Sequence, residues 1–530
     1  MNPSESPPQM KPWKLTKKRQ MHVLTSRLFI IILLILIQLA TLMFIILKLS
    51  ALRYWVSAAF RLFSFIVVLS ILPREDNPSY KLSWVILIMA FPLMGGIFYL
   101  CFGRKRNSSK MARQMDRYCE ILLHKDHGQS GKIHDPEECI RRLQVNHPTL
   151  ARQANYIYSN SGFELYQNTE AEYFPVGEKF YARLIEELSQ AKKFILMEYF
   201  IVHPGKMWNS ILDILIEKIQ QGIPVYFLYD DFGCATTFPP MYHEFLKSKG
   251  FRIGVFNPLR PRLNPAANYR DHRKICVVDG KVGFTGGINL ADEYINEQER
   301  FGHWKDTAVM LRGDAVQSLT EMFLELWQFA CQETVNISDF LTSPGISCEG
   351  FVQPYGDSPL DNCNLAENIY MQILNHAQNY VYITTPYLIL DNEMINALCL
   401  ASQSGVDVRI MTPNIPDKWY VHLVTRSHYR QLLEAGVRIF EYTPGFIHAK
   451  MFVSDDDTAV VGTTNMDFRS FYLHFECGIA FYLCPIVSQV KQDFLRTQNL
   501  SQEITLEQEK KVSTVVRILR SLLRAFAPLM

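Results

Sequence analysis

The sequence predicts an α/β protein made of two pseudo-symmetric halves, each a mixed sheet flanked by helices, preceded by N-terminal transmembrane helices. The first observation is the string His272–Asp279, whose pattern His-x-Lys-x4-Asp returns at His448–Asp455. The second is that each copy is followed by a glycine and, three residues later, an asparagine, at Gly286–Asn289 and Gly462–Asn465. One short motif can match by chance, but two copies with the same extension indicate a duplicated chain.

The segments around the two motifs repeat as well, and they supply the expected strands and helices. Three pairs match: Ala191–Val202 with Ala377–Leu388, Gly222–Asp230 with Gly405–Pro413, and Gly250–Pro258 with Gly436–Pro444. Each pair is a short apolar run typical of a buried strand. Between such runs lie amphipathic segments, for example one with Phe180, Leu184 and Leu188 on a single helical face. Alternating strands and helices favour a mostly buried sheet covered by helices.

Composition limits the classes of function that fit. The chain has 530 residues and a formal net charge of +2. A nearly neutral chain without a basic, aromatic-lined tract is not typical of a protein that binds nucleic acid. The 11 cysteines are scattered without CxxC or zinc-ligand spacing, which indicates free thiols in a reducing compartment.

The N-terminal part contains three apolar runs. Leu28–Leu49 is long enough to cross a bilayer, and Trp84–Phe102 is a second strong run that is broken by Pro92, Gly95 and Gly96. Tyr54–Leu72 is also apolar but contains Arg61, so it could span, re-enter or lie at the interface. Basic residues flank both ends of this region, so the positive-inside rule places both ends in the cytoplasm. We therefore expect two full crossings and one partial element in the cell membrane, with the catalytic region on the cytoplasmic side.

The remaining sequence divides the chain into five regions. We expect a membrane anchor at 1–108, a connector at 109–160, two similar halves at 161–345 and 346–500, and a C-terminal tail at 501–530. In the tail, Val515, Leu519 and Leu522 share one helical face and Arg517 and Arg520 lie on another. Such a helix can lie on anionic lipid or pack on the protein core, and the sequence leaves both open.

The repeated motif suits chemistry at a phosphodiester. Residues two apart on a strand share a face, so His272 and Lys274 project together, as do His448 and Lys450. A neutral imidazole is a nucleophile towards phosphorus, and a protonated one can donate to the leaving oxygen. Each copy supplies half of this set, so the two halves must face each other. No carboxylate or cysteine lies at ligand spacing, which disfavours a metal at the histidines.

The other motif residues are expected to support the histidines. Asn289 and Asn465 offer amide donors for the phosphate oxygens. Asp279 and Asp455 complete the predicted catalytic set and lie at turns, where we expect them mainly to hold the chain or to pair a lysine.

The paired motifs resemble those of the phospholipase D superfamily. Asn268–Lys274, Gly283–Tyr294, Asn465–Ser470 and Asp76–Trp84 are similar to bacterial cardiolipin synthases, and the resemblance covers roughly residues 55–530. It implies that one phosphatidylglycerol gives its phosphatidyl group to a histidine and then to a second phosphatidylglycerol, forming cardiolipin and glycerol. It also implies no metal or nucleotide cofactor and no nucleic acid partner. The lipid partners are phosphatidylglycerol and anionic membrane lipid, and a homo-oligomer is left open.

The resemblance also implies residue roles. His272 is the nucleophile and His448 the general acid and then base, although the order can be reversed. Lys274, Lys450, Asn289 and Asn465 bind the phosphate, and a carboxylate beyond each motif, Asp306 or Glu476, orients a histidine. In relatives asparagine is usual at the positions of Asp271 and His474. An aspartate at 271 is expected to raise the pKa of the neighbouring His272.

Three other interpretations use the same residues. A hydrolytic phospholipase D would pass the phosphatidyl group to water, and a phosphatidylserine synthase or another phosphatidyltransferase would use a different alcohol. The non-enzyme alternative is an inactive membrane scaffold, which two intact motifs disfavour.

Overall fold

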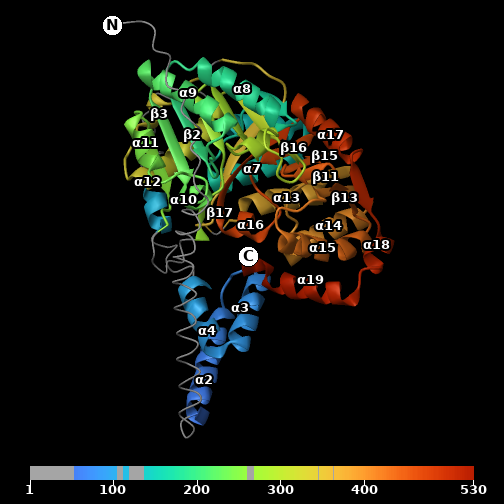
Figure 1. Cartoon of the computed structure of the whole chain (residues 1–530). Helices are drawn as coiled ribbons and strands as arrows, with labels where there is room; N and C mark the ends of the chain where they lie inside the picture. The colour runs from blue at the N-terminus through green and yellow to red at the C-terminus, as the bar shows by residue number, and fades with distance from the viewer. Residues whose placement is uncertain are drawn as a thin grey trace.

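The computed structural model describes residues 53–103, 111–118, 136–259, 268–343, 345–361 and 363–529. It consists of a two-sheet body from which a helical hairpin projects (Figure 1). The body is the duplicated α/β unit that the sequence predicts.

The first half is built on a seven-stranded mixed sheet in the order β1-β9-β7-β6-β2-β3-β4. Its strands are β1 (Thr169–Phe174), β2 (Ile195–Tyr199), β3 (Val225–Asp230), β4 (Arg252–Phe256), β6 (Ile275–Val278), β7 (Val282–Gly286) and β9 (Ala308–Gly313). Its helices are α8 (Gly177–Ser189), α9 (Lys206–Gln220), α10 (Asp231–Cys234), α11 (Tyr242–Ser248) and α12 (Val316–Cys331). The predicted apolar face of α8 is confirmed, because Phe180, Leu184 and Leu188 are buried.

The second half repeats this strand order in β10-β17-β16-β15-β11-β12-β13 and adds β18 at the edge. Its strands are β10 (Phe351–Asp357), β11 (Tyr380–Thr384), β12 (Asp407–Pro413), β13 (Arg438–Tyr442), β15 (Met451–Ser454), β16 (Thr458–Gly462), β17 (His474–Tyr482) and β18 (Ser501–Ile504). Its helices are α13 (Leu365–His376), α14 (Asn392–Gln403), α15 (Trp419–Glu434), α16 (Phe468–Tyr472) and α17 (Pro485–Gln498). The duplication read from the motifs therefore extends to the topology of the whole sheet.

The two halves share one apolar core. It contains Val277 of β6 and Leu311 of β9 together with Val453 of β15 and Ile479 of β17. Cys276, which precedes Val277 on β6, belongs to a separate core on the outer side of the first sheet. This is expected because successive side chains of a strand point to opposite faces of the sheet. The halves thus pack through the faces of their sheets, which brings the two motifs to one interface.

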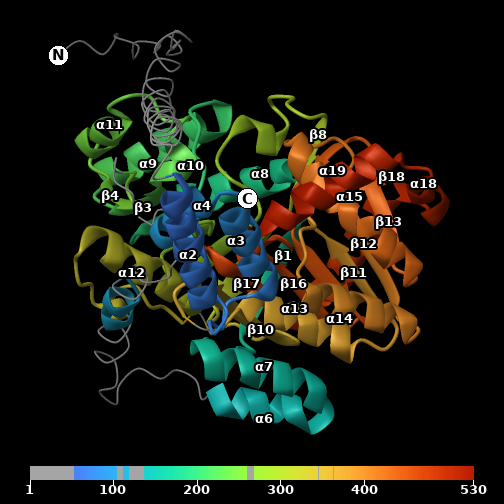
Figure 2. The ribbon, with the colours of Figure 1, turned by 90° about the horizontal axis from the view of Figure 1, so that it is seen from below.

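Two helices precede the first sheet, within the region expected to be a connector. These are α6 (Pro136–Asn146) and α7 (Pro148–Ser161), which lie side by side at the edge of the body (Figure 2). Leu150 and Ile157 of α7 join the core of the second half, and the Gln153 amide donates to the carbonyl of Ile369 at 3.1 Å. This segment therefore packs against the second half, although in the sequence it directly precedes the first sheet.

The apolar N-terminal segments form short helices. They are α2 (Arg53–Ile71), α3 (Pro78–Ala90), α4 (Pro92–Phe98) and the single π-turn η1 (Tyr99–Gly103). The break expected at Pro92 within the run Trp84–Phe102 is confirmed, because α3 ends at Ala90 and Pro92 begins α4. No helix in the described parts of the chain combines the length and hydropathy needed to cross a bilayer. The predicted span Leu28–Leu49 lies outside the described residues.

The C-terminal tail forms α18 (Leu506–Lys510) and α19 (Thr514–Phe526). Arg520 of α19 is buried, where its guanidinium donates to Glu509 at 2.7 Å. Val515, Ile518 and Leu522 on the same helix are more than half exposed. The helix therefore packs on the body through one face and presents an apolar face outward, beside α3 (Figure 1).

Candidate active site

Short strands carry each motif histidine into the opposite half. β5 (Arg270–Asp271) pairs in parallel with the start of β17, and the His272 amide donates to the Phe475 carbonyl at 2.9 Å. In the same way β14 (Gly445–Ile447) pairs in parallel with β8 (His303–Lys305), and the His448 amide donates to the Lys305 carbonyl at 2.7 Å. Each histidine is thus fixed by backbone bonds to the half that does not contain it.

The carboxylates that orient the histidines are exchanged between the halves. Nδ1 of His272 lies 3.0 Å from both oxygens of Glu476, and Nδ1 of His448 lies 2.6 Å from Oδ2 of Asp306. A carboxylate only accepts hydrogen bonds, so each Nδ1 carries the proton and each Nε2 keeps its lone pair. The two carboxylates named from the sequence therefore do contact the histidines, but each serves the motif of the other half.

Further contacts hold these carboxylates in place. The Thr463 hydroxyl donates to Glu476, and the Thr307 amide donates to Asp306 at 2.8 Å. Gly287 occupies the position in the first copy that Thr463 has in the second, and a Cβ there would lie 2.1 Å from Oδ1 of Asp306. Sequence reasoning missed the role of Thr463. The signal was its place directly after Gly462 of the repeat.

Both motif lysines are buried beside their histidines. Nζ of Lys450 lies 2.9 Å from Nδ1 of His448, and Nζ of Lys274 donates to the His272 carbonyl at 2.5 Å. Burial lowers the pKa of Lys274 to about 8 and that of Lys450 to about 7. Each lysine therefore loses its proton more readily than an exposed lysine does, and a bound anion would stabilise its charged form.

The histidines are held in their neutral form. Burial, followed by repulsion from Lys274 and Lys450, lowers the pKa of His272 well below its usual value. Burial and Lys450 lower the pKa of His448 to about 4, while Asp306 acts in the opposite direction. Repulsion from His448 also contributes to the lowered pKa of His272, so the rings share one electrostatic environment.

Asp271 does not have the expected effect on His272. Its carboxylate accepts from the Arg273 amide at 3.1 Å and lies beside Glu198, fully buried. Burial and Glu198 raise the pKa of Asp271 itself well above its usual value. The expectation that Asp271 raises the pKa of His272 is wrong, because burial and the lysines determine a downward shift.

The motif asparagines are buried, and the side-chain amide of each donates one hydrogen bond to a neighbouring side chain. Nδ2 of Asn289 donates to the Tyr294 hydroxyl at 2.7 Å, and Nδ2 of Asn465 to the Ser470 hydroxyl at 3.1 Å. Each amide nitrogen has a second hydrogen, so one donor per asparagine remains for another acceptor.

The motif aspartates lie at the far ends of their strands from the histidines. The Asp279 carboxylate accepts from the amides of Lys192, Lys193 and Phe194 at 2.6 to 3.1 Å. Asp455 accepts from the amides of residues 378–380 at 2.6 to 2.9 Å. Both residues have positive φ, and their bonds tie the turn after the motif to the start of the adjacent strand. Their contacts are those of structural residues.

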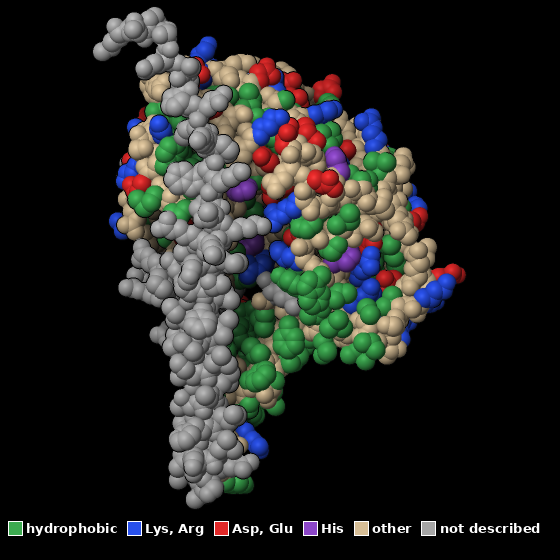
Figure 3. Space-filling model, in the orientation of Figure 1, with side chains coloured by type: hydrophobic (Ala, Val, Ile, Leu, Met, Phe, Trp, Pro, Cys, Tyr) green, Lys and Arg blue, Asp and Glu red, His purple; other side chains and the backbone are tan. Residues whose placement is uncertain are grey.

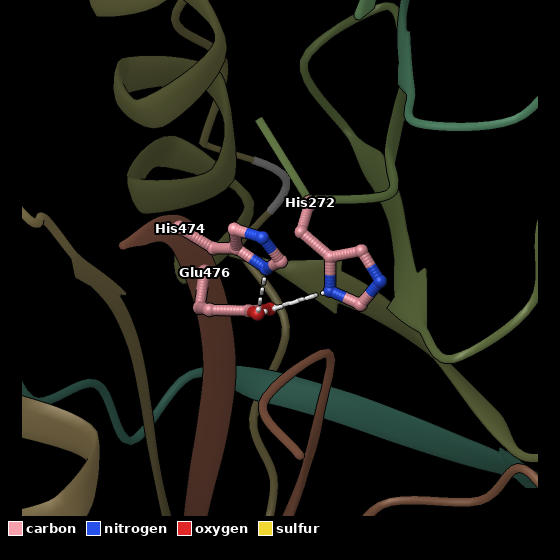
Figure 4. A group of neighbouring side chains, drawn as sticks. All are labelled: His272, His474 and Glu476. Atoms are coloured by element: carbon pink, nitrogen blue, oxygen red, sulfur yellow. Dashed lines mark hydrogen bonds and ion pairs between the residues drawn. The ribbon is translucent and has the colours of Figure 1, made fainter. Parts of the chain in front are cut away.

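A third histidine lies next to the pair formed by His272 and Glu476. His474 lies beside His272 with ring centroids 5.3 Å apart, and its Nδ1 is 3.5 Å from Oε1 of Glu476 (Figure 4). One ligand atom from each of His272, His474 and Glu476 lies within 4.8 Å of the others. The fold thus assembles a set of possible metal ligands that the spacing along the chain does not reveal.

Comparison with known proteins agrees with this architecture. Residues 184–327 and 370–498 match the family model described as cardiolipin synthase, PLD-like domain. Residues 62–104 match a model described as phospholipase D-nuclease N-terminal. The first match covers one part of each half and includes both motifs.

Individual relatives extend over most of the chain. An uncharacterized protein of Streptococcus mutans is 41% identical over 85% of this chain and 96% of its own length. Cardiolipin synthase 2 of Bacillus anthracis is 35% identical over 89% of this chain and 91% of its own. The crystal structure of phosphatidylserine synthase from Haemophilus influenzae has the same fold, with a TM-score of 0.56 and 16% identity over 72% of this chain and 98% of that chain. The chain therefore belongs to the cardiolipin synthase family with a phospholipase D-like domain.

Proposed function

We propose that the chain is a cardiolipin synthase, which transfers a phosphatidyl group from one phosphatidylglycerol to another and releases glycerol. The observation that carries the proposal is the exchange of carboxylates, which leaves one Nε2 lone pair on each of two histidines at a single interface. Two such nitrogens suit a reaction in which one attacks phosphorus and the other transfers a proton.

The proposed reaction has two steps. Nε2 of neutral His272 attacks the phosphorus of the first phosphatidylglycerol, and the bond to the glycerol oxygen breaks as that oxygen takes a proton from protonated His448. His448, now neutral, then removes the proton from a hydroxyl of the second phosphatidylglycerol. The resulting oxygen attacks phosphorus, the phosphorus–nitrogen bond breaks, and both histidines return to their starting forms.

The different surroundings of the two histidines support this order. Asp306 lies 2.6 Å from His448 and favours its protonated form. The main influences on His272 are burial, three lysines and His448, all of which favour its neutral form. Each histidine has a carboxylate partner, but only Asp306 is among the main influences on the pKa of its histidine. The histidine whose neutral form is favoured by all its main influences is suited to be the nucleophile, and the one whose carboxylate raises its pKa is suited to be the acid.

The lysines and asparagines are proposed to bind the substrate phosphate. Lys274 and Lys450 place two cations beside the histidines, and Asn289 and Asn465 each keep one amide hydrogen. The negative charge of a phosphodiester would offset the repulsion that lowers the pKa of His448. Substrate binding would therefore favour protonation of His448, which supplies the proton that the first step consumes.

We also propose that the protein is a multi-pass membrane protein whose catalytic region lies on the cytoplasmic side. Hydrophobic side chains gather at the lower end of the body and on the projecting hairpin (Figure 3). They include Leu82 and Met89 of α3 and Val515, Ile518 and Leu522 of α19. Ser83 of α3 donates to the Ala525 carbonyl of α19 at 2.7 Å, so these two helices lie in contact. We propose that this surface rests on the bilayer that holds the substrate.

The products of the purified protein test the proposal. The full chain is incubated in vesicles of phosphatidylglycerol, and the lipids are separated by mass. Cardiolipin with an equal amount of glycerol is expected. Phosphatidic acid without cardiolipin would instead identify water as the acceptor and the protein as a hydrolase.

A further inference from the structure

His474 is buried, and the polar contacts of its ring are incomplete. It is 8% exposed, its Nε2 has no hydrogen-bond partner within the described residues, and its Nδ1 reaches only the Glu476 carboxylate, in an ion-pair contact of 3.5 Å. A buried polar group without a partner costs about 1–3 kcal/mol. Such a group in a folded protein calls for an explanation, and one explanation is a ligand that it is built to hold.

The surroundings of His474 identify the kind of ligand. Its Nδ1 faces the Glu476 carboxylate at 3.5 Å, and Nδ1 of His272 faces the same carboxylate at 3.0 Å (Figure 4). Two imidazole nitrogens and one carboxylate oxygen, mutually within 4.8 Å, match the His₂Glu donor set that holds zinc and leaves a fourth position open. Thr463 donates to Glu476 and would orient it as a ligand.

We propose that His272, His474 and Glu476 form an inhibitory site for a borderline-soft divalent cation such as Zn²⁺. A cation bound at Nδ1 of His272 replaces the proton that this nitrogen now shares with Glu476. That proton passes to Nε2 of the same ring, because a neutral imidazole carries one proton. Nε2 then has no lone pair for phosphorus, and the ring is inactive as a nucleophile. The inhibition rests on the proposed role of His272, whereas the binding of the cation does not.

The charges around the site determine which cations it accepts. Lys274 and Lys450 lie near His272 and oppose any cation. Only the strong bonds that Zn²⁺, Ni²⁺ or Cu²⁺ make to imidazole can offset that repulsion, whereas Mg²⁺ and Ca²⁺ require several oxygen ligands. The site therefore discriminates against the abundant hard cations.

The test compares the full-length protein with the His474→Asn variant, in which one proposed ligand is removed and the His272–Glu476 pair is kept. The rate of cardiolipin formation is measured at increasing ZnCl₂ concentrations. The rate of each protein is expressed relative to its own rate in EDTA. The original protein is expected to lose activity reversibly, at a Zn²⁺ concentration at least about tenfold lower than the variant requires. MgCl₂ at the same concentrations is expected to have no effect in either protein.

A second readout does not depend on turnover. Titration calorimetry with ZnCl₂, and the visible absorption of Co²⁺ bound in its place, are expected to show a site of one ion per chain that His474→Asn lacks. Nine free cysteines in the described residues can also bind zinc, and the variant retains all of them as an internal control. Equal Zn²⁺ binding by the two proteins would overturn the site. Loss of the site in the variant without any difference in inhibition would overturn the inhibitory role. A protein without cardiolipin synthesis would still report on the site through Co²⁺, so failure of the proposed function is distinguishable.

Discussion

Oδ2 of Asp306 lies 2.6 Å from Nδ1 of His448, although 142 residues separate them and they belong to different halves of the duplication. The reciprocal pair, Glu476 and His272, is separated by 204 residues. Neither half alone contains an oriented histidine, so the active unit is the pair of halves.

Removal of an orienting carboxylate should lower turnover without unfolding the protein. Asp306→Asn and Glu476→Gln keep the shape of the side chain but remove the charge that holds each Nδ1 proton. Loss of such a partner typically costs about 10–100-fold in activity. The measurement is kcat for cardiolipin formation, with circular dichroism as the control for folding. Activity within twofold of the original protein in both variants would show that the exchanged carboxylates do not position the histidines.

A side chain at Gly287 should disturb the same pair. The Cβ of Gly287→Ala would lie 2.1 Å from the Asp306 carboxylate, which must then move away from His448. We expect turnover to fall by about tenfold or more. The matched variant is Thr463→Ser at the equivalent position of the second copy, which keeps the hydroxyl that donates to Glu476 and should retain most activity. Equal rates for Gly287→Ala and the original protein would contradict the tight fit at Asp306.

The sequence predicts the duplicated fold better than the arrangement of side chains between its halves. The strand order of both sheets repeats as the duplication implies, and the motif pattern predicts His272 and His448 as the reactive pair. The exchange of Asp306 and Glu476 depends on how two sheets pack across 142 and 204 residues, and no local pattern encodes that distance. The contact of Thr463 with Glu476 lies within the second half, and only the place of Thr463 directly after Gly462 of the repeat points to it.

The break in the apolar run 84–102 could be predicted from Pro92, which starts a second helix there. One departure from the sequence prediction has a local cause. The prediction that Asp271 raises the pKa of His272 rests on their adjacency in the chain. On an extended backbone neighbours point to opposite sides, and the Asp271 carboxylate instead meets Arg273 and Glu198.

The pH dependence of kcat/KM should reveal the lowered pKa of His272, the proposed nucleophile, when the substrate is phosphatidyl-p-nitrophenol, whose leaving group needs no proton from His448. The reaction needs neutral His272, and burial with nearby lysines lowers its pKa well below 6.5. As pH falls, kcat/KM should therefore hold through 6.5 and decline only at lower pH. In Lys274→Met one repelling charge is absent, so the pKa of His272 should rise and the acid limb should move to higher pH. An acid limb that stays in place in this variant would show that Lys274 does not act on the histidine.

The apolar face of α19 should contribute to membrane binding. Replacing Val515, Ile518 and Leu522 by serine removes exposed apolar surface while leaving the buried Arg520–Glu509 pair intact. Each buried aliphatic side chain is worth about 1.5–3 kcal/mol, so binding of the full chain to phosphatidylglycerol vesicles should weaken measurably in a flotation assay. Val145→Ser, at an equally exposed residue of α6, is the control and should bind as the original protein does. Unchanged flotation of the triple variant would place α19 away from the bilayer.

The most direct test of the account is to trap the covalent intermediate. In His448→Asn the first step still proceeds with phosphatidyl-p-nitrophenol, whose leaving group needs no acid, but the second step lacks its base. Intact-protein and peptide mass spectrometry should then find one phosphatidyl group attached to His272, and none in His272→Asn. A phosphatidyl group on a residue outside the two motifs, or undiminished cardiolipin synthesis by either variant, would contradict the claim that two histidines from opposite halves act on one phosphorus.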